Sequence, residues 1–97
     1  LPVVLRFNLP GMDHKTKRMA EAMGFTDHSP AAFIREIEHI LDEISIPHSL
    51  AEINVPEDCA ERVSRKALED SAAATNPRAA TAGEVKALIK EAISKAR

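Results

Sequence analysis

The chain has few of the residues that usually indicate a particular kind of site. Among its 97 residues there are three aromatics, all Phe, and one cysteine, Cys59. A lone cysteine cannot form an internal disulfide, so nothing indicates an oxidising compartment, and we expect a cytoplasmic protein. The net charge of −2 excludes the basic surface that nucleic-acid binding requires. No apolar run approaches the roughly 18 residues of a membrane span, so we expect no membrane insertion.

What the chain does contain is an aliphatic and charged composition. Hydrophobic residues make up 44% and charged residues 29% of the sequence, a balance typical of globular proteins. Its length corresponds to one small domain at most, with a core of aliphatic side chains. The chain opens with Leu1–Leu5, which includes no initiator Met and no signal-peptide pattern. We interpret this opening as a start inside a larger protein.

Helical periodicity is strongest in the middle of the chain. Ser29 is a suitable N-cap, Pro30 suits the first helical position, and apolar side chains follow at helical spacing. We expect this helix to end near Ile46, because Pro47 disfavours helical geometry in the residue before it. The apolar positions are Phe33, Ile34, Ile37, Ile40, Leu41 and Ile44, and the opposite, solvated face holds Arg35, Glu36, Glu38, Asp42 and Glu43.

Weaker signals predict the remaining elements. One helix with apolar positions Met12, Met19 and Met23, and with Thr16 between them at the same spacing, is expected to end at Gly24 in a left-handed conformation. Residues 1–7 fit a buried strand or a helix, and helix is the simpler choice because no other segment would pair with a strand. We also expect a turn of helix over 49–53 and a helix that begins at Pro56, with the apolar stripe Cys59, Val63 and Ala67. A loop is expected over 71–77. The last helix is expected to follow a capping box formed by Thr81 and Glu84. That last helix carries Val85, Leu88, Ile89, Ala92 and Ile93 and ends in Lys95 and Arg97. The predicted fold is therefore all-α, an array of four to six short helices.

Composition and spacing predict no catalytic, cofactor-binding or metal-binding constellation. The four histidines, His14, His28, His39 and His48, never stand three or four residues apart, as helix-borne metal ligands often do. Cys59 lies on an apolar stripe with no histidine nearby to activate it, so we interpret it as a small buried hydrophobe. The lysines of the last helix alternate with glutamates and indicate a solvated face.

Four stretches carry a further signal. They are Leu1–Asn8, Met19–Gly24, Ile46–Asp58 and Thr75–Arg78 followed by Thr81. In this order they resemble the C-terminal part of the helical domain of iron-containing (group III) alcohol dehydrogenases, whose last two stretches read GIP-x-x-L-x-x-LGVPEED and TNPR-x-x-T. Ser45 and Asn54 stand where that family usually has glycine, and Ala72 stands where many members have a cysteine near the active site. The resemblance covers essentially the whole chain, residues 1–97.

The resemblance implies a partial dehydroquinate synthase-like alpha domain. It also implies an NAD(P) domain and an iron (or sometimes zinc) ion, bound by one Asp and three His, that polarises the alcohol oxygen. The family's metal-ligand helices and cofactor domain precede the position of Leu1, so we expect this chain to hold neither Fe(II), Zn nor NAD(P), and to be inactive alone. In the full-length enzyme the substrate is an alcohol or aldehyde, and transhydrogenation between hydroxy acids and oxo acids stays open.

For this chain the resemblance gives structural expectations. The loop containing Ala72, Thr75 and Asn76 is expected to border the substrate pocket. Arg78 is expected to pair with a carboxylate and Thr81 to cap the last helix. Alone, the chain is expected to self-associate as a dimer or a higher oligomer, because Leu1–Phe7 leaves apolar surface uncovered. The alternative is a free-standing helical module that presents an apolar groove to a partner helix.

Overall fold

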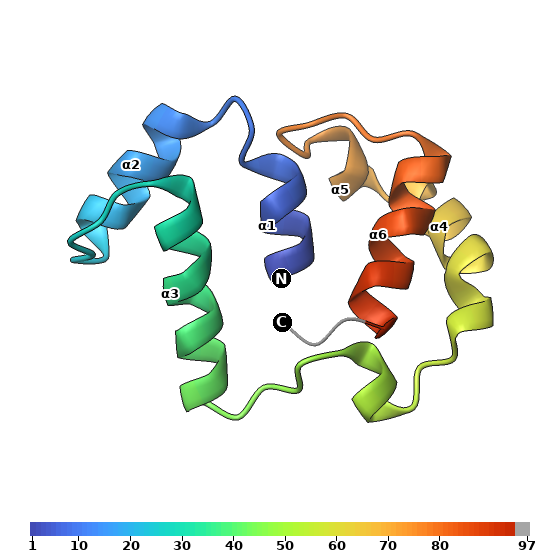
Figure 1. The fold of residues 1–97 in the computed structure, drawn as a ribbon. Helices are drawn as coiled ribbons and strands as arrows, with labels where there is room; N and C mark the ends of the chain where they lie inside the picture. Colours follow the sequence, from blue (N-terminus) through green and yellow to red (C-terminus); the bar gives the residue numbers. More distant parts are fainter. Residues whose placement is uncertain (95–97) are drawn as a thin grey trace. The chain divides into compact units, whose positions relative to one another are not determined.

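The computed structural model describes residues 1–94 and is helical throughout (Figure 1). Those residues form six α-helices and two 3-10 helices, and they contain no strand. This confirms the predicted all-α fold. The chain divides into two compact units, Leu1–Ile46 and Pro47–Arg97. The expected C-terminal residues Lys95 and Arg97 of the last helix lie outside the described residues.

The first unit consists of α1 (Pro2–Asn8), α2 (Asp13–Ala22) and α3 (Pro30–Glu43), and both α1 and α2 pack against α3. Helix, the simpler of the two choices for the start of the chain, is therefore correct. An ion pair between Arg6 and Glu38 joins α1 to α3, so Glu38 is not simply a solvated residue. The core consists of Leu9, Ala20 and Phe33, with Leu5, Phe25, Ile34 and Ile37 packed against it.

The buried face of α2 includes Thr16 of the predicted stripe but not its methionines Met19 and Met23. Met19 and Met23 are 37% and 46% exposed, whereas Thr16 and Ala20 are fully buried. Thr16 tolerates burial because its Oγ1 donates a hydrogen bond of 2.9 Å to the carbonyl oxygen of Met12, one turn earlier. The small side chains of this face therefore lie against the core, and the flexible methionines lie at its margin.

Helices α2 and α3 end in the same way. After α2, Gly24 has φ +79°, and its N–H and that of Phe25 donate to the carbonyls of Glu21 and Ala20. This pattern is the Schellman ending that Gly24 predicts. After α3, Ser45 has φ +61°, and its N–H and that of the next residue donate back in the same pattern.

The predicted end of α3 near Ile46 is therefore wrong by three residues, since α3 ends at Glu43. The left-handed Ser45 stops the helix before the effect of Pro47 is needed. At the other end the prediction is correct. Ser29 Oγ accepts a hydrogen bond of 3.2 Å from the N–H of Ala32, and Pro30 occupies the first turn.

The second unit contains η1 (Leu50–Ile53), η2 (Glu57–Cys59), α4 (Ala60–Glu69), α5 (Ser71–Ala74) and α6 (Ala82–Ser94). Helix α4 packs chiefly on α6, and η1 and η2 also contact α6. The predicted turn over residues 49–53 and the helix start after Pro56 are both confirmed. No helix within residues 1–94 combines the length and the apolar composition needed to cross a membrane.

Two details of the second unit correct the sequence-based expectations. The buried face of α4 begins with Ala60 and continues with Ser64, whereas Val63 is 39% exposed. Of the predicted stripe, Cys59 is buried as expected and Ala67 is half-buried, so only Val63 is misplaced. Ser64 Oγ is satisfied by donating to the Glu61 carbonyl at 2.8 Å. Residues 71–74 form the single helical turn α5, where a loop was expected.

Candidate functional site

The segment between α4 and α6 is held by a series of local hydrogen bonds. Asp70 Oδ1 accepts from the N–H of Ala72 at 2.8 Å and caps α5. At the other end of α5, Thr75 Oγ1 donates to the carbonyl of Ala72 at 3.1 Å. Asn76 Nδ2 then donates to the carbonyl of Arg78 at 2.6 Å, across the intervening proline. The turn is therefore fixed by its own polar groups, and α5 buries none of its residues.

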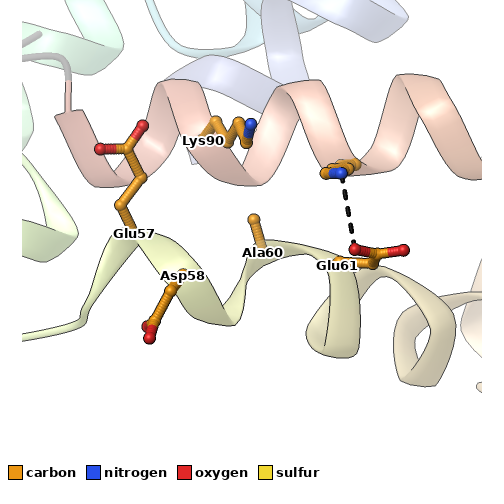
Figure 2. A pocket seen from close by; sticks show the side chains of 6 residues that line it. Glu57, Asp58, Ala60, Glu61 and Lys90 are labelled. Atoms are coloured by element: carbon orange, nitrogen blue, oxygen red, sulfur yellow. Dashed lines mark ion pairs between the residues drawn. The ribbon is translucent and has the colours of Figure 1, made fainter.

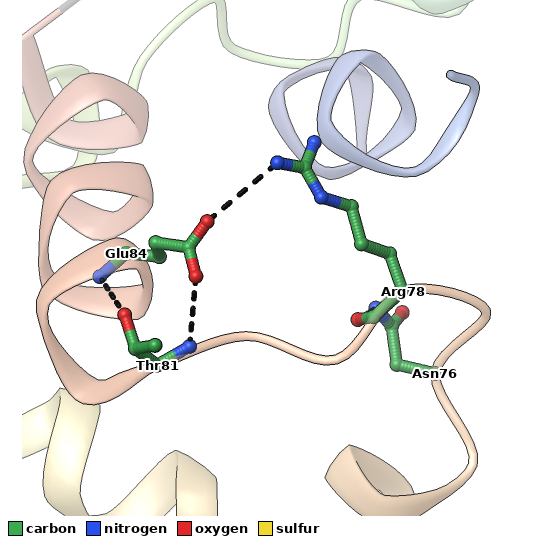
Figure 3. A network of polar contacts seen from close by, with 4 residues as sticks. All are labelled: Asn76, Arg78, Thr81 and Glu84. Atoms are coloured by element: carbon green, nitrogen blue, oxygen red, sulfur yellow. Dashed lines mark hydrogen bonds and ion pairs between the residues drawn. The ribbon is translucent and has the colours of Figure 1, made fainter. Parts of the chain in front are cut away.

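The start of α6 continues this network (Figure 3). The N–H of Glu84 donates to Thr81 Oγ1 at 3.2 Å, and the N–H of Thr81 donates to Glu84 Oε1 at 3.0 Å. These are the two bonds of the predicted capping box. Arg78 Nη2 lies 3.6 Å from the other carboxylate oxygen, Glu84 Oε2. Glu84 thus connects the helix start to the preceding loop.

The electrostatics of Glu84 follow from these contacts. Hydrogen bonds from the backbone and the side chain of Thr81 hold the pKa of Glu84 below its ordinary value, and the positive charge of Arg78 acts in the same direction. Both side chains of the Arg78–Glu84 pair are about two-fifths exposed, so solvent screens their attraction. The pair orients the loop more than it stabilises the fold.

The structure brings Asn76, Arg78 and Thr81 into one network, and it places Ala72 and Thr75 on the exposed helical turn before it. Nothing in the described residues places a substrate next to this turn. The role of Ala72, Thr75 and Asn76 at the pocket border therefore stays a prediction.

A separate hollow of about 400 Å³ lies between α6 and the start of α4 (Figure 2). On the two sides of this hollow, Lys86 Nζ and Glu61 Oε2 lie 3.7 Å apart and form an ion pair. Sequence reasoning missed this hollow because its two walls are some 30 residues apart in the chain. The lining mixes both charges and includes no Ser, Cys or His: it consists of Glu57, Asp58, Ala60, Glu61, Lys86 and Lys90.

The described histidines make local contacts. His28 Nε2 lies 2.8 Å from the carbonyl oxygen of Phe25, and its Nδ1 lies 3.7 Å from Glu21 Oε1. His39 Nε2 lies 3.1 Å from Glu43 Oε1, one turn along α3. Within residues 1–94, no three His, Cys, Asp or Glu side chains are grouped as a metal site requires. The described residues therefore do not fit a complete metal centre.

Comparison with protein families identifies the fold's relatives. The model of the C-terminal domain of the Fe-containing alcohol dehydrogenase family matches residues 1–93, nearly the whole chain. The chain belongs to this family. The resemblance found in the four sequence stretches is thereby confirmed, and the helical architecture agrees with it. The same comparisons gave no significant match to a curated protein or to a solved structure.

Family membership accounts for the left-handed conformation of two non-glycine residues. Ser45 and Asn54, the positions where the resemblance expects glycine, have φ +61° and +66°, and within residues 1–94 they are the non-glycine residues with positive φ. The chain therefore keeps the backbone turns that glycine would favour while carrying side chains there. Asn adopts this conformation more readily than Ser does.

Family membership also indicates that the full-length protein is a dehydrogenase-type enzyme, with iron and NAD as the cofactors that the family implies. Because residues 1–94 offer no grouped ligands, they hold no complete site for that metal.

Proposed function

We propose that this chain is the distal part of the helical domain of an NAD(P)-dependent alcohol dehydrogenase. The observation that carries the proposal is the family match over residues 1–93. The full-length enzyme interconverts alcohols and aldehydes by metal-assisted hydride transfer. Its metal ligands and its nucleotide-binding residues lie outside this chain, so no catalytic step is assigned to residues 1–94, and the 97-residue chain is inactive alone.

The contribution of this chain to the enzyme is structural. Two observations support this role: each unit has its own packed helices, and several helix ends are fixed, since side chains cap the starts of α3, α5 and α6 and left-handed residues follow α2 and α3. Helices with satisfied ends form a rigid support, and rigid supports keep catalytic groups of neighbouring elements in position.

The loop at α5 is the part of the chain that we place at the border of the substrate pocket. Its support is the local bonding of Asp70, Thr75 and Asn76, which orders an exposed turn without any buried side chain. A turn that is already ordered can meet a substrate without a further loss of conformational entropy. Ala72 and Thr75 are the exposed side chains that would face the alcohol.

The first experiment tests the enzyme. The full-length protein, loaded with Fe(II) or Zn(II), is assayed for NAD(P)-dependent oxidation of a panel of alcohols and for reduction of the matching aldehydes. We expect turnover that a chelator abolishes and added metal restores, and none from the 97-residue chain. Turnover of a hydroxy acid with an oxo acid, without added nucleotide, would identify transhydrogenation instead.

Metal analysis of the 97-residue chain gives an independent check. We expect no stoichiometric iron or zinc after dialysis, because its described residues group no ligands. Tight binding of one metal ion per chain would contradict the placement of the ligands elsewhere.

The second experiment tests the loop. In the full-length enzyme, Ala72→Leu and Thr75→Val enlarge or dehydrate the exposed turn, while Ala31→Leu makes a matched change at an exposed position of α3. We expect the first two to change KM with the size of the alcohol, and the control to leave KM unchanged. Equal effects of all three variants would contradict a pocket role for the α5 turn.

A further inference from the structure

We draw no further inference here: the strongest candidate, the exposed apolar surface of Ile40 on α3 and Ile44 at its C-cap, carries nothing because nothing in the structure shows what covers it.

Discussion

Replacing Ser45 by glycine is expected to stabilise the first unit. Ser45 is the left-handed residue after α3, with φ +61°, and its N–H and that of Ile46 already donate to the helix's last carbonyls. The substitution therefore leaves the hydrogen-bond pattern unchanged. It removes only the Cβ and the hydroxyl at a position where a Cβ is sterically disfavoured.

The magnitude follows from two opposing terms. A residue with a Cβ pays about 1–2 kcal/mol to adopt the left-handed conformation, and glycine avoids most of this. Glycine also increases the conformational entropy of the unfolded chain, and this reduces the stabilisation by about 0.5–1 kcal/mol. The net gain in the free energy of unfolding is about 0.5–1 kcal/mol. For a domain of this size it corresponds to a Tm higher by roughly 2–8 °C.

Two variants of this unit serve as controls. Ser45→Ala removes the hydroxyl but keeps the Cβ, and it should leave stability nearly unchanged. Gly24→Ala adds a Cβ at φ +79°, where no heavy atom lies within 4 Å of the new carbon. Its cost comes from the backbone conformation alone, and we expect a loss of about 0.5–1 kcal/mol, the reverse of the gain at Ser45.

Urea unfolding followed by circular dichroism measures all of these variants. The comparison with Asn54→Gly is the most stringent, because Asn54 has a similar φ of +66° but tolerates it better. Its gain should be smaller than that of Ser45→Gly. The reasoning is refuted if Ser45→Gly fails to raise the urea midpoint, or if Ser45→Ala raises it equally.

Three further outcomes are expected. Thr81→Ala removes the N-cap hydroxyl of α6 and should lower the free energy of unfolding by roughly 1 kcal/mol. Arg78→Ala removes a screened surface ion pair and should lower it by less than about 0.5 kcal/mol. Equal losses for the two variants in urea unfolding would argue against the capping box. The pKa of Glu84 is lowered in the folded state, so its contribution to stability is present above pH 4.5 and is lost as the pH falls through the lower folded pKa. Stability of Glu84→Gln should accordingly decline less between neutral and acidic pH than that of the parent protein, and parallel pH profiles would exclude this assignment. The 97-residue chain alone should form dimers or larger species in sedimentation velocity experiments, and a strictly monomeric chain at high concentration would disprove the expected self-association.

Helices with a strong periodic pattern and clear end signals were predictable from sequence. Ser29 and Pro30 at the start of α3, Gly24 after α2, and the Thr81–Glu84 pair before α6 each act through contacts within a few residues. Because such contacts are local, the identity of the residue nearly determines the geometry.

What sequence reasoning missed depends on tertiary context or on an uncommon conformation. A serine rarely takes positive φ, so residue preferences give no signal for the early end of α3, and only the family's glycine at the position of Ser45 indicates it. The buried faces of α2 and α4 centre on Thr16 and Ser64, whose hydroxyls bond to their own helix. A hydropathy pattern treats both as polar, so the predicted faces consisted mainly of larger neighbours such as Met19 and Val63, although Thr16 stood among the predicted positions.

The candidate site likewise has a local part that the sequence predicts and a part that depends on residues elsewhere. The polar network of Asn76, Arg78, Thr81 and Glu84 spans only nine residues, and its pairs could be expected from a short motif. Whether the α5 turn meets a substrate depends on residues elsewhere in the enzyme, and no pattern within this chain encodes that contact.

The small side chains at the start of α4 set a limit on how this domain can vary. Ala60 and Ser64 are 1% and 3% exposed, one turn apart, and Ala60 points toward α6 (Figure 2). A larger side chain at Ser64 would need room that a packed interior does not offer, whereas one at Ala60 could extend into the neighbouring hollow. Of the two sites, Ser64 should therefore retain only Gly, Ala, Ser and Cys in a saturation library. The exposed Val63 between them should accept almost any residue, so that variation along α4 would follow the helix repeat.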